Sequence, residues 1–147
     1  MDTNTVPVQI SEFLSECRVM SMATVAGKCP YCAPVFFAWD NSQQYFIVKS
    51  SASTIHFANA VYSGIAAGSV LPDVTQIAHI RGLQFNGICR TPVDSDEDIR
   101  IRKLYYSRYP IGKLIDGDFL LIFPDNFKYT DNRMGFGKKL LWVRQSQ

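Results

Sequence analysis

A predicted strand that ends in a lysine, followed by a predicted helix that opens with hydroxyl side chains, is the sequence feature best suited to binding a charged group. The residues are Lys49, Ser50, Ser51, Ser53 and Thr54. The first turn of a helix carries backbone N–H groups without partners and a partial positive charge, so it binds phosphate well. The hydroxyls add donors and the lysine adds charge. The pattern indicates a phosphate-binding site, with simple capping of the helix by Ser51 or Ser53 as the alternative.

Two cysteines three residues apart, Cys29 and Cys32, form the sequence Cys-Pro-Tyr-Cys, which resembles the glutaredoxin dithiol motif. Dithiol chemistry needs the first cysteine at a helix N-terminus, where the pKa of its thiol falls. Residues 33–39 are mostly aromatic and β-branched and predict a strand instead. We therefore favour a hairpin that contains cysteines, and keep thiol–disulfide exchange as an alternative. A zinc site that adds His56 or His79 lacks the usual ligand spacing.

Two further segments resemble binding motifs only in part. Residues 81–87 share Arg81, Gly82 and Phe85 with an RNA-binding consensus, but a leucine stands where that consensus needs an aromatic residue for base stacking. Residues 135–139, Gly-Phe-Gly-Lys-Lys, match neither a Walker A loop nor the Rossmann glycine pattern. We interpret the first segment as a strand and the second as a hairpin turn with two cations.

Length and composition bound the class of protein. The chain has 147 residues, of which 47% are hydrophobic and 19% charged, so we expect one globular domain over residues 1–147. Its net charge of +2 gives no general case for a nucleic-acid partner. No apolar run approaches the ~18 residues of a membrane span. Four cysteines and no signal-peptide pattern predict reduced thiols in a cytoplasmic protein.

Hydrophobic periodicity predicts the elements that position these residues. Helices are expected over residues 6–17, 50–63 and 95–109. Strands are expected over residues 18–26, 31–39, 44–49, 64–71, 77–93, 118–131 and 139–144. Most strands are joined by short turns, and no regular βαβ repeat occurs. The pattern therefore favours an antiparallel barrel with flanking helices, a mainly β fold of the α+β class.

This order of elements resembles the FMN-binding split barrel of the pyridoxamine-phosphate-oxidase-like superfamily. Residues 18–25 resemble its first strand, residues 33–39 its second, and residues 45–51 its third strand with the phosphate-binding exit. Two further stretches resemble an uncharacterised bacterial branch of that superfamily. They are Ile-Arg-Gly-Leu-Gln-Phe-x-Gly at residues 80–87 and Thr-Asp-Asn-x-x-Gly-Phe-Gly-Lys-Lys-x-x-Trp at residues 130–142.

The resemblance implies a six-stranded antiparallel split barrel that forms a homodimer, with FMN in two clefts at the subunit interface. The phosphate is expected at the exit of the third strand and the isoalloxazine along the second strand, and the partner chain closes the site. The residues implied in cofactor binding are Pro34, Val35, Phe36, Lys49, Ser50, Ser51, Ser53, Thr54, His56, Lys138, Lys139 and Trp142. No catalytic acid or base stands out, and no metal site is expected.

One departure from the superfamily concerns the charge at the phosphate. Many relatives place a lysine or arginine just inside the second helix, where this chain reads Ser53-Thr54-Ile55-His56. Only Lys49 or a protonated His56 can replace that cation. The leading hypothesis is an FMN-dependent oxidoreductase, a reductase or oxidase acting on an unknown small molecule. A cofactor-free dimeric binding or scaffold protein is the alternative, and a thiol–disulfide oxidoreductase is the third hypothesis.

Overall fold

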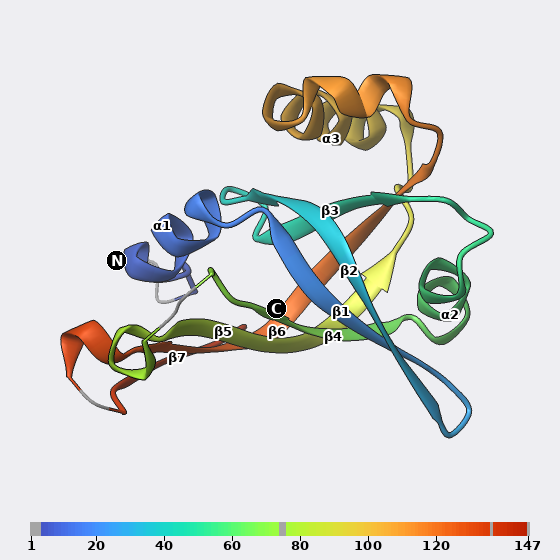
Figure 1. Ribbon diagram of the computed structural model, residues 1–147. Helices are drawn as coiled ribbons and strands as arrows, with labels where there is room; N and C mark the ends of the chain where they lie inside the picture. The colour runs from blue at the N-terminus through green and yellow to red at the C-terminus, as the bar shows by residue number, and fades with distance from the viewer. Residues whose placement is uncertain (1–3, 74–75, 136, 147) are drawn as a thin grey trace.

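The computed structural model describes residues 4–73, 76–135 and 137–146. Within these ranges it contains α-helices, short 3-10 helices (η) and strands (Figure 1). The elements in chain order are α1 (Val8–Glu16), β1 (Val19–Ala26), β2 (Cys29–Asp40), β3 (Tyr45–Ser50), α2 (Ile55–Ser63), β4 (Ile65–Val70), η1 (Ile77–His79), β5 (Arg81–Arg90), α3 (Ser95–Arg108), η2 (Pro110–Leu114), β6 (Asp118–Asp131), η3 (Asn132–Met134) and β7 (Lys139–Val143).

All strands belong to one antiparallel sheet with the order β3-β2-β1-β4-β5-β6-β7. An additional pairing of β3 with the first half of β6, from Phe46↔Ile122 to Ser50↔Asp118, closes the first six strands into a barrel. The second half of β6 leaves the ring and pairs with β7. The predicted α+β split barrel with flanking helices is therefore confirmed. The sheet has a seventh strand because β6 is long enough to pair with two partners along one edge.

The strand β5 shows how the sequence pattern builds the barrel wall. Leu83 and Phe85 point inward and are buried, and Gln84 and Ile88 point outward. A register shift follows Asn86, where β5 bulges against β6. At the bulge, a Cβ atom on Gly87 would lie 2.0 Å from the carbonyl oxygen of Phe123, so only glycine fits there.

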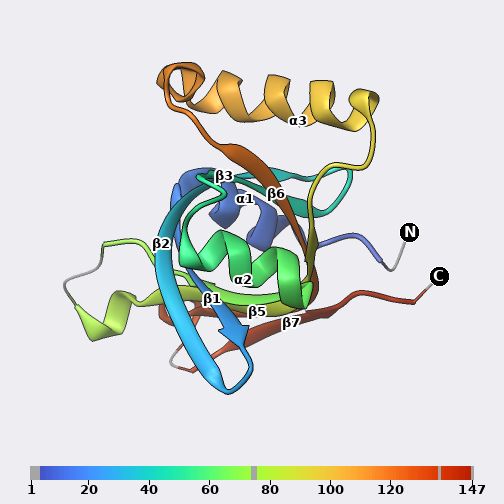
Figure 2. The same ribbon diagram turned by 90° about the vertical axis from the view of Figure 1, so that its right-hand side faces the viewer.

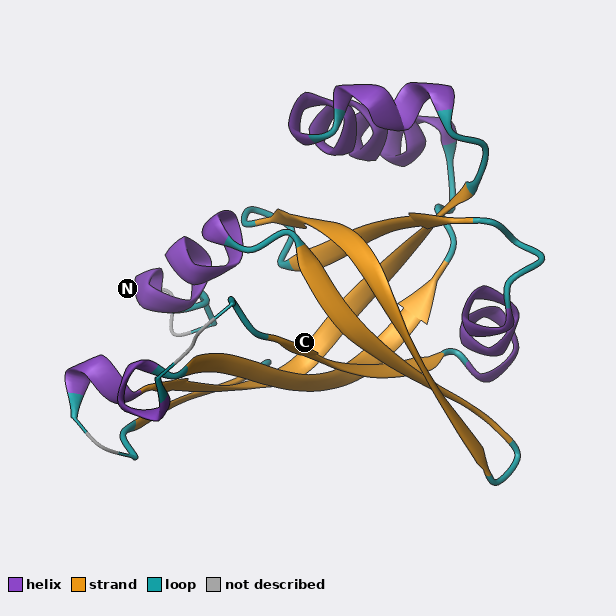
Figure 3. Cartoon of the chain, viewed as in Figure 1, coloured by secondary structure: helices purple, strands orange, loops and turns teal. Residues whose placement is uncertain are grey.

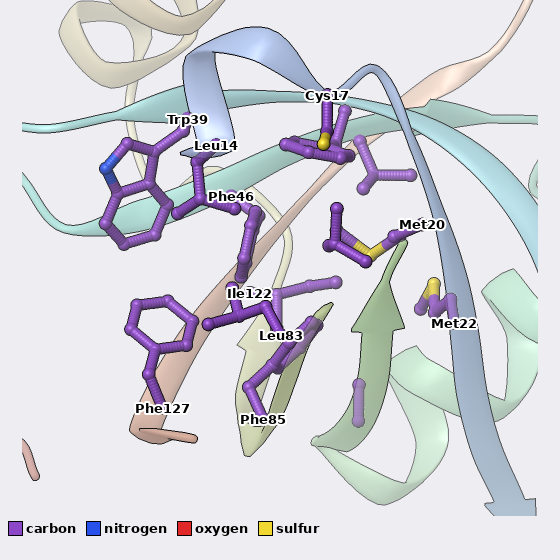
Figure 4. Packing of buried hydrophobic residues seen from close by; sticks show 14 of the residues in the cluster. Leu14, Cys17, Met20, Met22, Trp39, Phe46, Leu83, Phe85, Ile122 and Phe127 are labelled. Carbon is purple, nitrogen blue, oxygen red and sulfur yellow. The ribbon is translucent and has the colours of Figure 1, made fainter. Parts of the chain in front are cut away.

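Aromatic rings fill the barrel interior (Figure 4). Phe46 is central, with its ring centroid 4.7 Å from that of Phe85 and 4.9 Å from that of Trp39. Phe127 closes the stack against Trp39 at 5.6 Å. Burying rings of this size supplies much of the hydrophobic stabilisation of a small barrel, and tilted ring pairs add about 0.5–1.5 kcal/mol each.

The helices lie outside the strands (Figure 3). In Figures 1 and 2, α1 and α2 lie at opposite ends of the barrel, and α3 lies above it. The helix α3 packs through Ile101 and Tyr105 onto a second hydrophobic cluster that includes Tyr45 and Phe119. This cluster connects α3 to the outer side of β3 and β6, so α3 covers a part of the barrel next to the exit of β3.

Several predicted boundaries were wrong, and the following three concern residues singled out in the sequence. The second helix begins at residue 55 rather than 50, because Ser50 still belongs to β3 and Thr54 is the N-cap residue. The long strand predicted over 77–93 begins at residue 81, after η1. The second strand begins at Cys29, so both exposed cysteines lie within it.

In the described part of the chain, no helix is long and apolar enough to cross a membrane.

Candidate functional site

Most of the predicted cofactor-binding residues meet at one cavity of about 380 Å³, which we call the site cavity. It lies between the second half of β2, the β3–α2 turn and the segment that joins α3 to β6. The lining residues from β2, β3 and α2 were predicted, and those from α3 and the following segment were not. The lining residues are Pro34, Val35, Phe36, Lys49, Ser50, Ser51, His56, Tyr105, Gly112, Ile115 and Asp116.

Lys49 lines the site cavity, and its ammonium group is hydrogen-bonded within the chain. Its Nζ donates hydrogen bonds to the hydroxyl of Tyr106 at 2.9 Å, to the carbonyl of Gly112 at 2.9 Å and to the carbonyl of Ile115. The ammonium also lies 5.1 Å from the centroid of the Tyr106 ring. An ammonium group has three N–H donors, and these contacts use all of them. Lys49 therefore fastens η2 to β3 and forms one wall of the cavity.

His56 lies at the start of α2 and is half-buried. Its Nε2 is 2.7 Å from the Ser50 hydroxyl and 3.4 Å from the Thr54 hydroxyl. Burial lowers the pKa of His56 below its ordinary value of 6.5, because the charged imidazolium loses hydration. The ring is therefore neutral at pH 7 and contributes no positive charge to the cavity in this state.

The hydroxyls of the β3–α2 turn bond to each other. The hydroxyls of Ser51 and Ser53 are 2.8 Å apart, and the Thr54 hydroxyl donates to the Ser51 carbonyl at 2.7 Å. The Thr54 hydroxyl also accepts from the N–H of Phe57 and caps α2. The sequence analysis gave capping of this helix by Ser51 or Ser53 as the alternative to phosphate binding. The helix is indeed capped by a hydroxyl of this turn, but the residue is Thr54. Ser53 and Thr54 lie in this turn next to the cavity-lining Ser51.

The wall contributed by α3 and η2 is mainly aromatic and apolar. The Tyr109 ring lies 5.5 Å from that of Phe36, and its hydroxyl donates to the carbonyl of Phe37. Burial raises the pKa of Tyr105 to about 12, so its phenol is uncharged at neutral pH. Tyr105 is one of the buried residues of α3. Asp116 follows a short 3-10 helix that no sequence pattern indicated.

Lys138, Lys139 and Trp142 do not join the site cavity within one chain. The start of β7 lies at the opposite end of the molecule from α2 (Figure 1). Trp142 is only 5% exposed, packs 5.4 Å from the Phe127 ring and donates through Nε1 to the Asn4 carbonyl. Its indole is thus part of the core. Lys139 donates to the Thr130 hydroxyl at 2.9 Å. A contribution of Lys138 and Lys139 to a partner's cavity stays a prediction.

The start of the C-terminal motif forms a corner around the buried carboxylate of Asp131. Asp131 accepts hydrogen bonds from the backbone N–H, Nε and Nη2 of Arg133 and from the Tyr129 hydroxyl. The Arg133 guanidinium holds the pKa of Asp131 below its ordinary value. Asn132 ties this corner to Ile80 through its N–H. The motif residue Phe136 lies outside the described residues. These contacts give Asp131 and Asn132 of the motif a structural role.

A second cavity of about 490 Å³ lies beside this corner, on the outer side of the sheet. Its polar lining comes from β4 and from the two stretches, residues 80–87 and 130–142, that resemble the bacterial branch. The polar lining residues include Ser69, Gln84, Thr130, Asn132 and Lys139. The two stretches singled out in the sequence therefore come together in space, away from the site cavity.

The geometry of β2 argues against dithiol chemistry by Cys29 and Cys32. Residues three apart on an extended strand point to opposite faces, and their Cα atoms are roughly 10 Å apart. A disulfide needs Cα atoms closer than about 7 Å, so these two thiols cannot pair while β2 is formed. The other two cysteines are buried, and burial raises the pKa of Cys17 and brings that of Cys89 to about 11. Neither buried thiol is a nucleophile at neutral pH.

Within the described ranges, no three His, Cys, Asp or Glu side chains gather closely enough to hold a metal ion.

The barrel is similar to solved structures of very different sequence. HutZ, the heme storage protein of Vibrio cholerae, matches with a TM-score of 0.66 at 19% identity over 92% of each chain. An FAD-binding protein of Mesorhizobium loti matches with a TM-score of 0.67 at 12% identity, over 83% of this chain and 91% of that one. A heme-binding protein of Mycobacterium smegmatis reaches 0.74 at 13% identity, over 88% of this chain and 54% of that one. These likenesses establish the split-barrel fold.

Relatives of similar sequence and length occur in enterobacteria. A UPF0306 protein of Cronobacter sakazakii is 33% identical over 138 residues, which cover 94% of this chain and 95% of the relative. The UPF0306 protein YhbP of Escherichia coli O157:H7 is 31% identical over 137 residues, 93% of this chain and 92% of the relative. No family model matches the chain. Because the identity extends over nearly the whole length of both chains, this protein belongs to the UPF0306 family.

Proposed function

We propose that this protein binds FMN in the site cavity, as a homodimer, and serves as a flavin-dependent oxidoreductase for a small molecule. One observation carries the proposal. The residues expected at the two ends of FMN, Pro34 to Phe36 on β2 and Ser50, Ser51 and His56 at the β3–α2 turn, line a single cavity although they come from different elements.

The ring end of the cavity suits a flat aromatic ligand. Phe36 is 54% exposed and presents an apolar surface beside Pro34, and Ile115 faces the same space from the η2 side. Large exposed apolar side chains around a cavity are typical of ligand sites. Bound flavin supplies the redox chemistry, and the protein supplies orientation and exclusion of water. The side chains of Pro34, Phe36 and Ile115 would hold the ring.

A second copy of the chain is proposed to cover the outer side of the sheet. This outer sheet face carries exposed apolar side chains from β1, β4, β5 and β7, where Ile65 pairs directly with Ile88. Between them lies an apolar hollow of about 360 Å³ that also contacts Val25. The face continues to Phe36, which pairs with Val19 and lines the site cavity. A partner on this face would therefore also border the flavin.

Flavin titration tests the proposal, because bound flavin is usually quenched by neighbouring aromatic rings. We expect saturable quenching of FMN fluorescence with one site per chain. Replacing Ile115→Asp should weaken binding at least about tenfold, since burying a carboxylate against an apolar ring costs more than about 1.4 kcal/mol. The matched control is Ile99→Asp, at an exposed position on α3 that does not line the cavity. Absence of FMN binding at high micromolar concentration would refute the proposed function.

A cofactor-free scaffold is the second candidate, and one observation favours it. The hydroxyls of the β3–α2 turn and the ammonium of Lys49 are all bonded to groups of the same chain. A scaffold would form the same dimer and leave FMN fluorescence unchanged. The titration above therefore separates the two candidates directly.

A further inference from the structure

Among the described residues, the end of the site cavity next to the β3–α2 turn has no free cation in its lining. The ammonium of Lys49 is fully used by Tyr106, Gly112 and Ile115. Asp116 is the other charged residue that lines the cavity, and its carboxylate repels an anion. A dianionic phosphate placed here would therefore be poorly neutralised by the groups in their present state.

Among the described residues that line the cavity, His56 is the one whose side chain can gain a positive charge near neutral pH. It faces the hydroxyls of Ser50 and Thr54, and shares the cavity with Lys49 of β3, Tyr105 of α3 and Asp116 of the segment before β6. The ammonium of Lys49 is already bonded, and the phenol of Tyr105 is neutral. Imidazole is the side chain that changes charge most readily between pH 5 and 8.

The hydrogen bond between His56 and Ser50 gives the imidazole a way to exchange partners. Nε2 of the neutral ring and the Ser50 hydroxyl oxygen are 2.7 Å apart and form one hydrogen bond. In the neutral tautomer that carries its proton on Nδ1, Nε2 accepts this bond from the Ser50 hydroxyl. When the ring takes up a second proton, at Nε2, that nitrogen can donate to a phosphate oxygen and the Ser50 hydroxyl is free to donate to the same phosphate. Protonation of His56 thus turns His56 and Ser50, which bond to each other in the neutral state, into two donors for the same phosphate.

We propose that His56 decides whether the site accepts a phosphate ester, by taking up one proton from solution when FMN binds. This inference rests on the proposed flavin function. Riboflavin has the same ring but no phosphate, so it should bind without proton uptake. The site is then selective for FMN over riboflavin in a manner that depends on pH.

The sign of the pH dependence follows from linkage. Burial keeps the pKa of free His56 below 6.5, and a bound dianion beside the ring raises it. Between these two pKa values the bound state holds one more proton than the free state, so FMN affinity falls about tenfold for each unit of pH increase. The phosphate ester itself has a second pKa of about 6, so it is a dianion above that pH.

The test is the ratio of FMN affinity to riboflavin affinity, measured by fluorescence quenching between about pH 6.5 and 8.5. The ratio removes pH effects on folding or on the ring pocket, because both ligands share them. We expect the ratio to fall steeply with rising pH. In His56→Gln, the amide keeps a polar contact to Ser50 but cannot take up a proton, so the ratio should be low and flat.

Two further variants complete the experiment. His79→Gln removes the other histidine, which is exposed on η1 outside the site cavity, and should behave as the unmodified protein. His56→Arg supplies a permanent cation and should give a high ratio that is flat with pH. A pH-independent ratio in the unmodified protein, with both flavins bound, would overturn this inference and leave the flavin function intact. Failure of both flavins to bind would overturn the proposed function and this inference together.

Discussion

At the scale of single residues, Lys49 and His56 differ in what their hydrogen-bond partners leave them free to do. Both were candidates for the missing phosphate cation. The structure binds the lysine to carbonyl groups of η2 and leaves the histidine neutral beside a hydroxyl. The lysine is therefore a positioning residue for the cavity wall, and the histidine is the group whose charge can change.

Replacing Lys49→Met tests this division of roles. The variant keeps the apolar stem but loses one hydrogen bond to α3 and two to the η2 segment, so η2 should loosen. Hydrogen bonds from a charged donor contribute about 1.5–3 kcal/mol each, and partial exposure of this side chain lowers that figure. We expect a lower melting temperature, and FMN and riboflavin affinities that fall by the same factor. A loss confined to FMN would show instead that Lys49 binds the phosphate.

At the scale of elements, the split of β6 is what makes this barrel. Its first half pairs with β3 and closes the ring, and its second half pairs with β7. The register shift after Asn86 places the β5–β6 bulge between these two halves of β6. Glycine at position 87 is required there because the Phe123 carbonyl occupies the space of a side chain.

The substitution Gly87→Ala should therefore destabilise the barrel strongly. The added Cβ meets backbone atoms, which cannot move aside as a flexible side chain would, so we expect a loss at or above the ~1–3 kcal/mol typical of overpacking. Gly82→Ala in the same strand is the matched control, because its Cβ would meet the nearest atom, on Leu71, at 3.7 Å. Thermal unfolding followed by circular dichroism compares them. Equal melting temperatures for the two variants would contradict the role assigned to the bulge.

At the scale of the whole molecule, the outer sheet face exposes apolar side chains that a partner can cover. Its apolar residues come from strands that are far apart in sequence but adjacent in the sheet, such as β1, β4 and β5. The face continues to the site cavity through Phe36. Dimer formation and flavin binding are therefore expected to depend on each other.

Placing a charge on this face tests that coupling. Ile88→Glu changes a side chain that is 54% exposed in the single chain, and Ile99→Glu on α3 is the matched control at 65% exposure. Buried in a dimer interface, an unpaired carboxylate is costly, so Ile88→Glu should be a monomer by light scattering and should bind FMN more weakly. A dimer that survives Ile88→Glu would place the interface on another surface of the barrel.

The sequence by itself predicted most elements and the class of fold, because hydrophobic periodicity and turn residues act locally. The inward alternation of Leu83 and Phe85 is one example, and the split-barrel resemblance added the cavity-lining stretch on β2. The prediction from sequence failed at the exact start of α2, where only the structure shows that Thr54 rather than Ser51 caps the helix.

Tertiary structure alone decided which candidate groups are free to act. Lys49 finds its acceptors on η2, more than fifty residues away, and Trp142 lies in the core against Phe127. No local pattern encodes such contacts, because a donor or an indole becomes committed only when distant segments fold against it. The types and spacing of residues in the sequence therefore located the cavity. Long-range packing determined which charges the cavity can offer a ligand.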